Sequence, residues 1–256
     1  MNMNQWVFML ATTMVTSSAL AASNSIPLIP PPSGYNWVST VSAGTSWNTS
    51  SRSQTFYLTP ETLKSYPETN SSQAFLDGEF FLGVQKTLWP QIQGQLGLAF
   101  AVTGNAKLIG DILDDADPAF NNYNYQYKVS HTHIALQGKV LIDKGYSVIP
   151  WFSALAGLGF NRANAFTNSP TIFQAVPTSN FRSDSETSFT YALSVGLQKP
   201  VDNHWQVGVG YEFSDWGKSQ LGTAEGQTMG NGLSIDHMYV NSLLVNVTYL
   251  SIGTPA

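Results

Sequence analysis

The stretch Trp205–Phe213, WQVGVGYEF, alternates between bulky apolar side chains and small or polar ones. Odd positions carry Trp, Val, Val, Tyr and Phe, whereas even positions carry Gln, Gly, Gly and Glu. A period of two residues is typical of a β-strand, because successive side chains of a strand point to opposite faces. The stretch therefore predicts a strand with one bulky apolar face and one small or polar face. The fold depends on which of these faces is inside.

The same alternation recurs along the chain, for example in Ile92–Val102, Phe189–Gln198 and Leu243–Tyr249. These runs predict strands that reach the roughly 9–11 residues needed by a tilted transmembrane strand. The apolar parity changes near Val129, which predicts a bulge there. Eight strands are expected, near residues 35–47, 74–89, 91–106, 124–142, 148–162, 186–199, 204–216 and 237–250.

Short and long connections alternate between these strands. The connections after the second, fourth and sixth strands are tight turns at Trp89-Pro90, Asp143–Gly145 and Pro200–Asn203. The other connections run to roughly 15–25 residues, which is long for a compact domain, and are rich in Ser, Thr, Asn, Gly and Asp. In an up-and-down meander, all the long loops then leave from one end. This pattern of short periplasmic turns and four long extracellular loops is typical of outer-membrane barrels.

The low charge of the chain indicates which face is inside. Charged residues make up 11% of the sequence, whereas a soluble surface is about 25–35% charged. The face opposite the bulky side chains carries mainly Gly, Ala, Ser, Thr and Gln, which suit the narrow interior of an eight-stranded barrel. Closing the sheet into a barrel also gives every backbone N–H and C=O a hydrogen-bond partner, which is necessary because the hydrocarbon of the bilayer offers none. We therefore predict an all-β fold, an eight-stranded antiparallel up-and-down transmembrane β-barrel whose bulky side chains face lipid.

Aromatic residues gather near the ends of the predicted strands. Two aromatic belts fit the two membrane–water interfaces, where an amphipathic ring is most stable. The alternative is ordinary aromatic packing inside a soluble core. The belt at the periplasmic end is predicted to contain Trp37, Trp89, Trp151 and Trp205, and the belt at the other end Trp47, Tyr123, Tyr125, Tyr127, Trp216 and Tyr239.

The beginning of the sequence predicts export. The apolar run Trp6–Val15 precedes the small-residue site Ala19–Ala21, a pattern typical of a secretory signal peptide and too short for a membrane-spanning helix. We expect a signal peptide at 1–22, a Pro-rich N-terminal extension at 23–34, the barrel at 35–250 and a C-terminal tail at 251–256. The net charge of −5 argues against a nucleic-acid partner. The absence of Cys excludes disulfides and thiol chemistry.

Three stretches carry a resemblance to a known group of proteins: Leu108–Lys128 (LIGDILDDADPAFNNYNYQYK), Val129–Lys139 (VSHTHIALQGK) and Trp205–Gly222 (WQVGVGYEFSDWGKSQLG). The chain resembles small bacterial outer-membrane β-barrels, in the eight-stranded surface-antigen and opacity-type group. The resemblance implies location in the bacterial outer membrane and assigns no shared catalytic motif. One departure concerns the end of the barrel: such proteins commonly finish on an aromatic residue, whereas here Tyr249-Leu250 is followed by SIGTPA.

Four charged residues are expected to face the barrel interior. Asp77 and Glu79 share one face of the second predicted strand, Lys139 lies on the fourth, and Glu212 on the seventh. An unpaired charge is costly in a low-dielectric interior, so we expect the acids to pair with the lysine, with water-filled gaps between them. This cluster is interpreted either as a charge gate that plugs the barrel or as structural satisfaction of interior polar groups.

Two groups of residues are candidate metal ligands. His131 and His133 are two apart on one strand, so both project to one side and could bind Zn²⁺, although spacing identifies no third ligand. The alternative is a pair of hydrogen-bonded histidines. Acidic residues in the second long loop could bind Ca²⁺, but their spacing departs from an EF-hand, and the alternative is a solvated acidic loop. These acids are Asp111, Asp114, Asp115 and Asp117.

No local motif fixes a nucleophile, a phosphate loop or a dinucleotide site. We therefore expect no enzymatic activity and no cofactor. The expected function is a structural, surface-exposed outer-membrane protein whose loops serve adhesion or contact with a host or the environment. The alternatives are a narrow porin-like channel or small-molecule carrier and, less favoured, an outer-membrane enzyme. The expected partners are outer-membrane lipid and lipopolysaccharide, the outer-membrane insertion machinery, and a surface or host ligand for the loops.

Overall fold

The computed structural model describes residues 35–69, 73–175 and 178–251. The predicted signal peptide, the Pro-rich extension and the tail beyond Ser251 lie outside the described residues. In this described part of the chain, no helix is long and apolar enough to cross a membrane.

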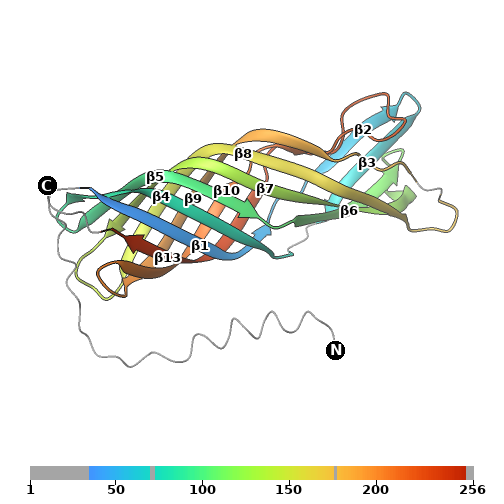
Figure 1. The fold of residues 1–256 in the computed structure, drawn as a ribbon. Helices are drawn as coiled ribbons and strands as arrows, with labels where there is room; N and C mark the ends of the chain where they lie inside the picture. Colours follow the sequence, from blue (N-terminus) through green and yellow to red (C-terminus); the bar gives the residue numbers. More distant parts are fainter. Residues whose placement is uncertain (1–34, 70–72, 176–177, 252–256) are drawn as a thin grey trace, which may run out of the picture.

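The central feature is a closed ring of eight antiparallel strands (Figure 1). The ring closes because β7 pairs with β5 on one edge and with β8 on the other. Each of the eight predicted strands overlaps one ring strand, so the predicted fold class is confirmed. In order around the ring the strands are β7 (Asn121–Ile142), β5 (Ile92–Thr103), β4 (Phe75–Trp89), β1 (Asn36–Asn48), β13 (Tyr239–Leu250), β10 (Trp205–Asp215), β9 (Asp184–Pro200) and β8 (Ile149–Pro170).

Strand β10 shows which face is outside. Val207 and Val209 are 41% and 55% exposed, whereas Gln206 and Glu212 are 2% and 6% exposed. Because the small and polar side chains fill the interior, the bulky ones form an apolar exterior. An apolar outer band on a closed ring of strands is the surface that a bilayer requires.

The narrow interior depends on glycine where strands approach closely. Gly83 of β4 is paired directly with Gly97 of β5. A Cβ atom on Gly97 would lie 2.4 Å from the Cα of Gly83, and one on Gly83 would lie 2.7 Å from the Phe81 ring. Gly97 therefore allows the two strands to approach closely, and Gly83 leaves room for the Phe81 side chain in the interior.

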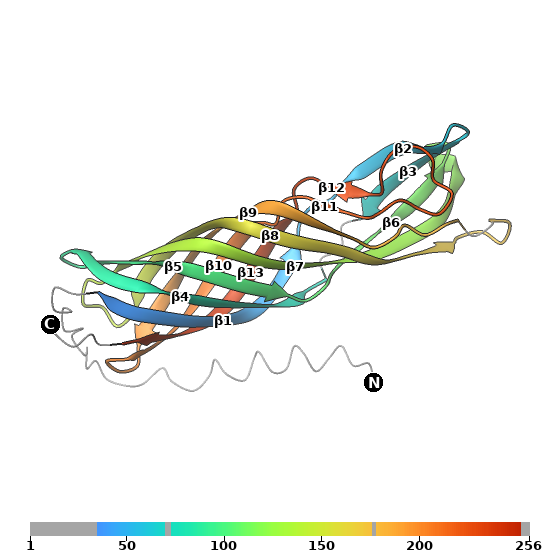
Figure 2. The same ribbon diagram turned by 45° about the horizontal axis from the view of Figure 1, so that its top comes forward.

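The sheet continues beyond the ring at one end (Figures 1 and 2). Strands β7 and β8 are each 22 residues long. The outer part of β7 pairs with β6 (Ala106–Asp114), β6 with β3 (Thr62–Thr69), and β3 with β2 (Ser53–Thr59). The first two long connections, predicted as polar loops, therefore contain strands that extend the barrel wall. We call this part of the sheet, β2, β3, β6 and the outer parts of β7 and β8, the extracellular extension.

Strand β7 explains the change of apolar parity near Val129. Its odd-numbered residues are buried without a break from Tyr123 to Leu141, so the strand has no bulge near Val129 and the predicted bulge is wrong in its position. The irregularity lies in the neighbouring strand β8, where the register shifts between Gln126 and Lys128 and Ala165 has a φ of 54°. The parity changes because the surroundings of β7 change near Val129. On the membrane side of Val129, apolar residues face lipid. On the extracellular side, apolar residues face an interior core and polar residues face water.

The extracellular extension has its own apolar core. The last two long connections fold onto it, and a two-stranded sheet of β11 (Ser219–Gln220) and β12 (Ser234–Ile235) lies within the final one (Figure 2). The long connections therefore form a packed structure over the mouth of the barrel. Its buried side chains include Tyr66, Tyr125, Tyr127, Phe166, Phe181, Trp216, Leu221, Leu233, Ile235 and Met238.

Candidate functional site in the barrel interior

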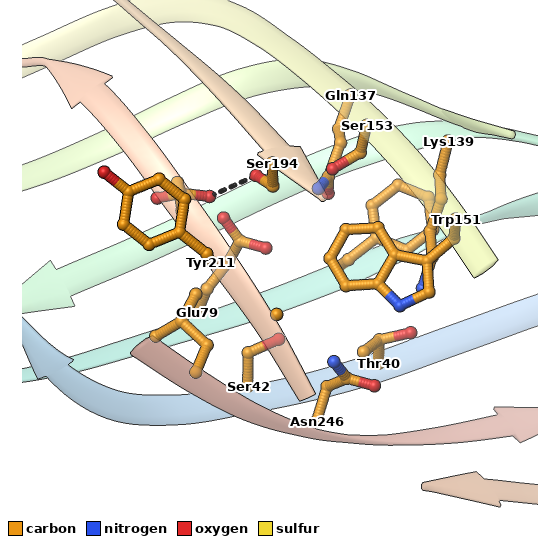
Figure 3. A pocket seen from close by; sticks show the side chains of 14 residues that line it. Thr40, Ser42, Glu79, Gln137, Lys139, Trp151, Ser153, Ser194, Tyr211 and Asn246 are labelled. Carbon is orange, nitrogen blue, oxygen red and sulfur yellow. Dashed lines mark hydrogen bonds between the residues drawn. The ribbon is translucent and has the colours of Figure 1, made fainter. Parts of the chain in front are cut away.

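The barrel interior contains a small polar cavity (Figure 3). Its volume is about 30 Å³, which is enough for roughly two water molecules. The cavity brings together three of the four predicted interior charges, Glu79, Lys139 and Glu212. Its lining also includes Thr40, Ser42, Phe81, Gln137, Trp151, Ser153, Ser194 and Asn246.

Lys139 is held by uncharged partners. Its Nζ donates a hydrogen bond to Gln198 Oε1 at 2.7 Å and lies 4.3 Å from the centre of the Trp151 ring. Gln198 in turn donates to Gln206. No salt bridge joins Lys139 to a carboxylate among the described residues. The amide and the aromatic ring occupy the lysine head group, so any pairing with the acids runs across the water-sized cavity, and the expected acid–lysine pairing with water-filled gaps stays a prediction.

The interior carboxylates accept hydrogen bonds from serine. Asp77 accepts from Ser46 at 2.9 Å and from Ser242 at 3.3 Å, while Glu212 accepts from Ser194 at 2.8 Å. Hydroxyl donors stabilise a buried carboxylate without a second charge. These serines are spread over three strands and were not identified from the sequence. Their inward parity was readable, but their partners depend on the register between strands.

Three polar atoms at the cavity are buried without a protein partner. They are Gln137 Oε1, Trp151 Nε1 and Asn246 Oδ1. Leaving such groups unsatisfied costs about 1–3 kcal/mol each, and the cavity has room for water that could satisfy them. The arrangement is therefore suited to hold a few ordered water molecules between Glu79, Glu212 and Lys139.

His131 and His133 project to the same, inward side of β7, as their spacing predicts, and they lie at the extracellular end of the interior. Nε2 of His131 is 3.1 Å from Nδ1 of His133, and Nδ1 of His131 is 2.6 Å from Asn161 Oδ1. His133 Nε2 lies 3.9 Å from Glu79 Oε2, which is too far for a hydrogen bond. Asn161 donates to the backbone oxygens of Trp216 and Lys218 at 2.7 Å each. The histidines therefore belong to a hydrogen-bonded chain that reaches the extracellular core.

Neither candidate metal site gains further ligands from the fold. Within residues 35–69, 73–175 and 178–251, no group of three or more His, Asp or Glu side chains is placed to hold a metal ion. In the acidic segment, Asp114 forms a 2.8 Å salt bridge with Lys64, and Asp117 accepts from the backbone N–H of Ala119 at 2.9 Å. Asp111 lies on β6, and Asp115 follows that strand directly. Two of the four acids therefore have structural contacts, and metal binding receives no support from the geometry.

The residues predicted for the aromatic belts differ in their exposure. Trp37, Trp89 and Trp205 are 63%, 63% and 46% exposed at the end with the short turns, and Tyr239 is 37% exposed at the other end. Trp151 and Trp216 are 9% and 2% exposed, so their assignment to the belts is wrong. Trp151 has inward parity on β8 and lines the cavity, while Trp216 packs in the extracellular core. Tyr123, Tyr125 and Tyr127 are also buried there.

Comparison by sequence matches the chain to no protein-family model and to no curated protein. Comparison by structure finds solved outer-membrane barrels. The outer membrane protease OmpT of Escherichia coli is 11% identical, with a TM-score of 0.50, and the match covers 84% of this chain and 96% of that one. OprG of Pseudomonas aeruginosa is 12% identical (TM-score 0.44, 88% and 100% covered). Neisserial surface protein A is 13% identical (TM-score 0.40, 84% and 98% covered). At these identities the likeness concerns the fold, which is that of bacterial outer-membrane β-barrels.

Proposed function

We propose that this outer-membrane β-barrel is a non-conducting surface protein that presents a rigid extracellular structure for contact with a partner outside the cell. The observation that carries the proposal is the double obstruction of the barrel. Inward side chains leave a cavity of only about 30 Å³ around Glu79, Lys139 and Glu212, and the apolar core of the extracellular extension lies over the mouth. A barrel of this kind serves to hold the extension at the cell surface.

The far end of the extension has features of a contact surface. Phe173 is fully exposed, and Phe120 and Ile172 are 50% and 46% exposed. Thr171 holds the two segments together, because its backbone N–H and its hydroxyl donate to the carbonyl oxygens of Asn122 and Asn121 at 2.8 and 2.7 Å. Exposed apolar side chains grouped on a folded tip are typical of sites that bind other molecules. Adhesion is therefore the proposed role of this tip.

The channel and carrier alternatives have weaker support. Small-molecule sites usually have volumes of about 300–1,000 Å³, and eight strands leave little room between interior side chains. Glutamines obstruct the end with the short turns, where Gln85 donates to Gln93 at 2.8 Å and accepts from Gln95 at 2.7 Å. An enzyme is not favoured. The interior acids Asp77 and Glu212 accept hydrogen bonds from serine hydroxyls, and the cavity beside Glu79 and Glu212 has room for water but not for a substrate.

Two measurements test the proposal. The purified protein, reconstituted in planar bilayers, should give no steady single-channel steps, and regular steps would contradict the non-conducting part. For the adhesive part, a non-adherent Gram-negative host should display either the wild type or a Phe120→Ser, Phe173→Ser variant. The wild type should increase attachment to epithelial cell monolayers, and the variant should not. Equal attachment at equal surface expression would contradict a role for the tip.

A further inference from the structure

The interior cavity is surrounded by more acidic than basic side chains. Glu79 and Glu212 line it together with Lys139, and Asp77 lies two residues before Glu79 on the same face of β4. Three carboxylates therefore share this part of the interior with one lysine. Ionised carboxylates are costly to bury unless a positive charge lies close to them. A cation bound between the two glutamates would offset the excess of negative charge.

The basic side chains near the glutamates are not hydrogen-bonded to them. The Lys139 head group is held by Gln198 and the Trp151 ring. The Nε2 atom of His133 is 3.9 Å from Glu79 Oε2, which is beyond hydrogen-bond distance. Among the described residues, Glu212 forms no salt bridge. The side chain of Glu79 is 9% exposed and Glu212 is 6% exposed, so both are buried acids without a cation in direct contact.

Two amide oxygens at the cavity are also without a partner. Gln137 and Asn246 are 8% and 4% exposed and line the cavity with Glu79 (Figure 3). Among the described residues, neither Gln137 Oε1 nor Asn246 Oδ1 accepts a hydrogen bond. The amides reach the cavity from β7 and β13, and the glutamates from β4 and β10. Carboxylate and amide oxygens, completed by water, are the ligands that Ca²⁺ prefers.

We propose that the barrel interior binds a Ca²⁺ ion between Glu79 and Glu212, with Gln137 Oε1 and Asn246 Oδ1 as further ligands. The cavity of about 30 Å³ holds roughly two water-sized spheres, which is enough for the ion and a water molecule that completes its shell. The charge of the ion equals the excess of the three carboxylates over the one lysine. The ion joins β4, β7, β10 and β13 across the interior, so it braces the barrel wall.

The ligands and the size of the cavity favour Ca²⁺ over other common divalent ions. A set made only of oxygen ligands suits a hard cation, whereas Zn²⁺ is bound mainly by nitrogen and sulfur. Mg²⁺ requires near-ideal octahedral geometry and usually keeps several of its water molecules. A cavity of about 30 Å³ does not have room for those waters. Ca²⁺ accepts irregular geometry and six to eight oxygens, which fits ligands from four different strands.

The test measures the metal that the folded barrel retains. The full barrel is refolded in detergent with Ca²⁺ and passed over a chelating resin, which removes ions from exposed sites, and its calcium is measured by elemental mass spectrometry. The wild type should retain a stoichiometric amount and release it on unfolding. It should also have a higher Tm than barrel refolded with a chelator, because a ligand of the folded state stabilises that state. Glu79→Gln and Glu212→Gln should each retain less by roughly tenfold or more, since the charge of the ligands sets the affinity.

The control removes acids elsewhere. Glu61→Gln, Asp115→Asn alters two exposed acids of the extracellular extension and should retain as much calcium as the wild type. If neither glutamate variant folds, as judged by heat-modifiable gel mobility, Gln137→Leu should still reduce retention, because it removes a ligand oxygen and no charge. Refolding with Mg²⁺ instead should leave little bound metal. A wild type that retains no calcium, equal retention of Mg²⁺, or folded variants that retain as much calcium as the wild type would overturn the proposal, whatever the conductance or adhesion of the protein.

Discussion

The rings of His131 and Trp216 stack with their centres 4.5 Å apart and their planes 6° apart. His131 projects from the barrel wall, whereas Trp216 follows β10 at the start of the last long connection. The stack therefore joins the polar interior of the barrel to the apolar core that covers its mouth. Asn161 reinforces the contact, because it bonds both the His131 ring and the Trp216 backbone oxygen.

Replacing Trp216 with alanine should loosen this closure. The indole is 2% exposed, and truncating a buried aromatic side chain costs about 3–5 kcal/mol. We expect a loss of this size in urea-induced unfolding from lipid vesicles, together with faster protease cleavage of the last connection. Trp205→Ala is the matched control, because that indole is 46% exposed on the lipid-facing side and should cost less. Equal losses in the two variants would show that Trp216 does not close the mouth.

Lys139→Met should destabilise the barrel even though it removes a buried charge. The change leaves Gln198 Oε1 without its 2.7 Å donor, and an orphaned buried acceptor costs about 1–3 kcal/mol. It also removes the basic side chain that faces Glu79 and Glu212 across the cavity. Unfolding in urea should shift to lower concentration, and Lys139→Arg should recover part of the loss. Lys144→Met, in an exposed turn, is the control, and identical behaviour of the two methionine variants would refute this role for Lys139.

The extracellular extension should be more stable in mild acid than above neutral pH. Burial raises the pKa of the Glu68 carboxyl to about 7, although the backbone N–H of Arg52 opposes this shift by donating to it. A carboxyl with a raised folded-state pKa favours folding below its ordinary pKa of 4.5 and loses this contribution as pH rises through about 7. Hydrogen exchange of β3 should therefore be slower at pH 5 than at pH 8, after correction for intrinsic exchange rates.

Glu68→Gln should remove this difference between the two pH values and protect β3 above neutral pH, because the amide stays uncharged. Glu61→Gln, at an exposed position in the turn between β2 and β3, is the control and should leave the pH dependence intact. If the protection of β3 from hydrogen exchange increased from pH 5 to pH 8 in the wild type, the raised pKa of Glu68 would not control the stability of the extension.

Placing arginine on the outer face of β10 should be costly in the membrane. Val209 is 55% exposed in the middle of the apolar band, and Arg at the bilayer midplane costs about 2–4 kcal/mol. We expect Val209→Arg to lower the stability of the folded barrel in vesicles by this amount. Ser185→Arg on the extracellular part of β9 is also exposed and should be nearly neutral. If Val209→Arg left the stability of the folded barrel unchanged, this face of β10 would not lie in the hydrocarbon.

The sequence predicts the ring of strands well, because a transmembrane strand alternates strictly between lipid-facing and interior side chains. On β10, bulky residues occupy one parity and small or polar residues the other, and lipid and the narrow interior select for these two classes independently. The positions of Glu79, Lys139 and Glu212 inside the barrel follow from the same parity. Their partners do not, since Ser194 and Gln198 become neighbours of the charges only through the register between strands.

The strands of the extracellular extension were not predicted, because their apolar side chains face inward and their polar side chains face outward, which is the reverse of the pattern in the membrane. Tyr125 and Tyr127 face inward to an apolar core while Asn124 and Gln126 face water, as in a soluble sheet. The change of parity at Val129 was the available signal, and it marks the level at which the chain leaves the membrane. Trp151 and Trp216 were wrongly assigned to the belts because only their position along the chain was used, and the direction in which each side chain points was not. On β8 the inward parity of Trp151 follows from its outward neighbours, Phe152 and Leu158.

The orientation of the side chains of β10 is the central claim, and the absence of Cys in the chain allows a direct test. Single cysteines at 206, 207, 209 and 212, each carrying a nitroxide, are examined in vesicles with dissolved oxygen and with a water-soluble nickel chelate as relaxing agents. Labels at 207 and 209 should collide strongly with oxygen, which concentrates in hydrocarbon, and labels at 206 and 212 should be shielded from it. Strong oxygen collisions at 206 and 212, or no alternation along the strand, would contradict a barrel with its bulky residues in lipid.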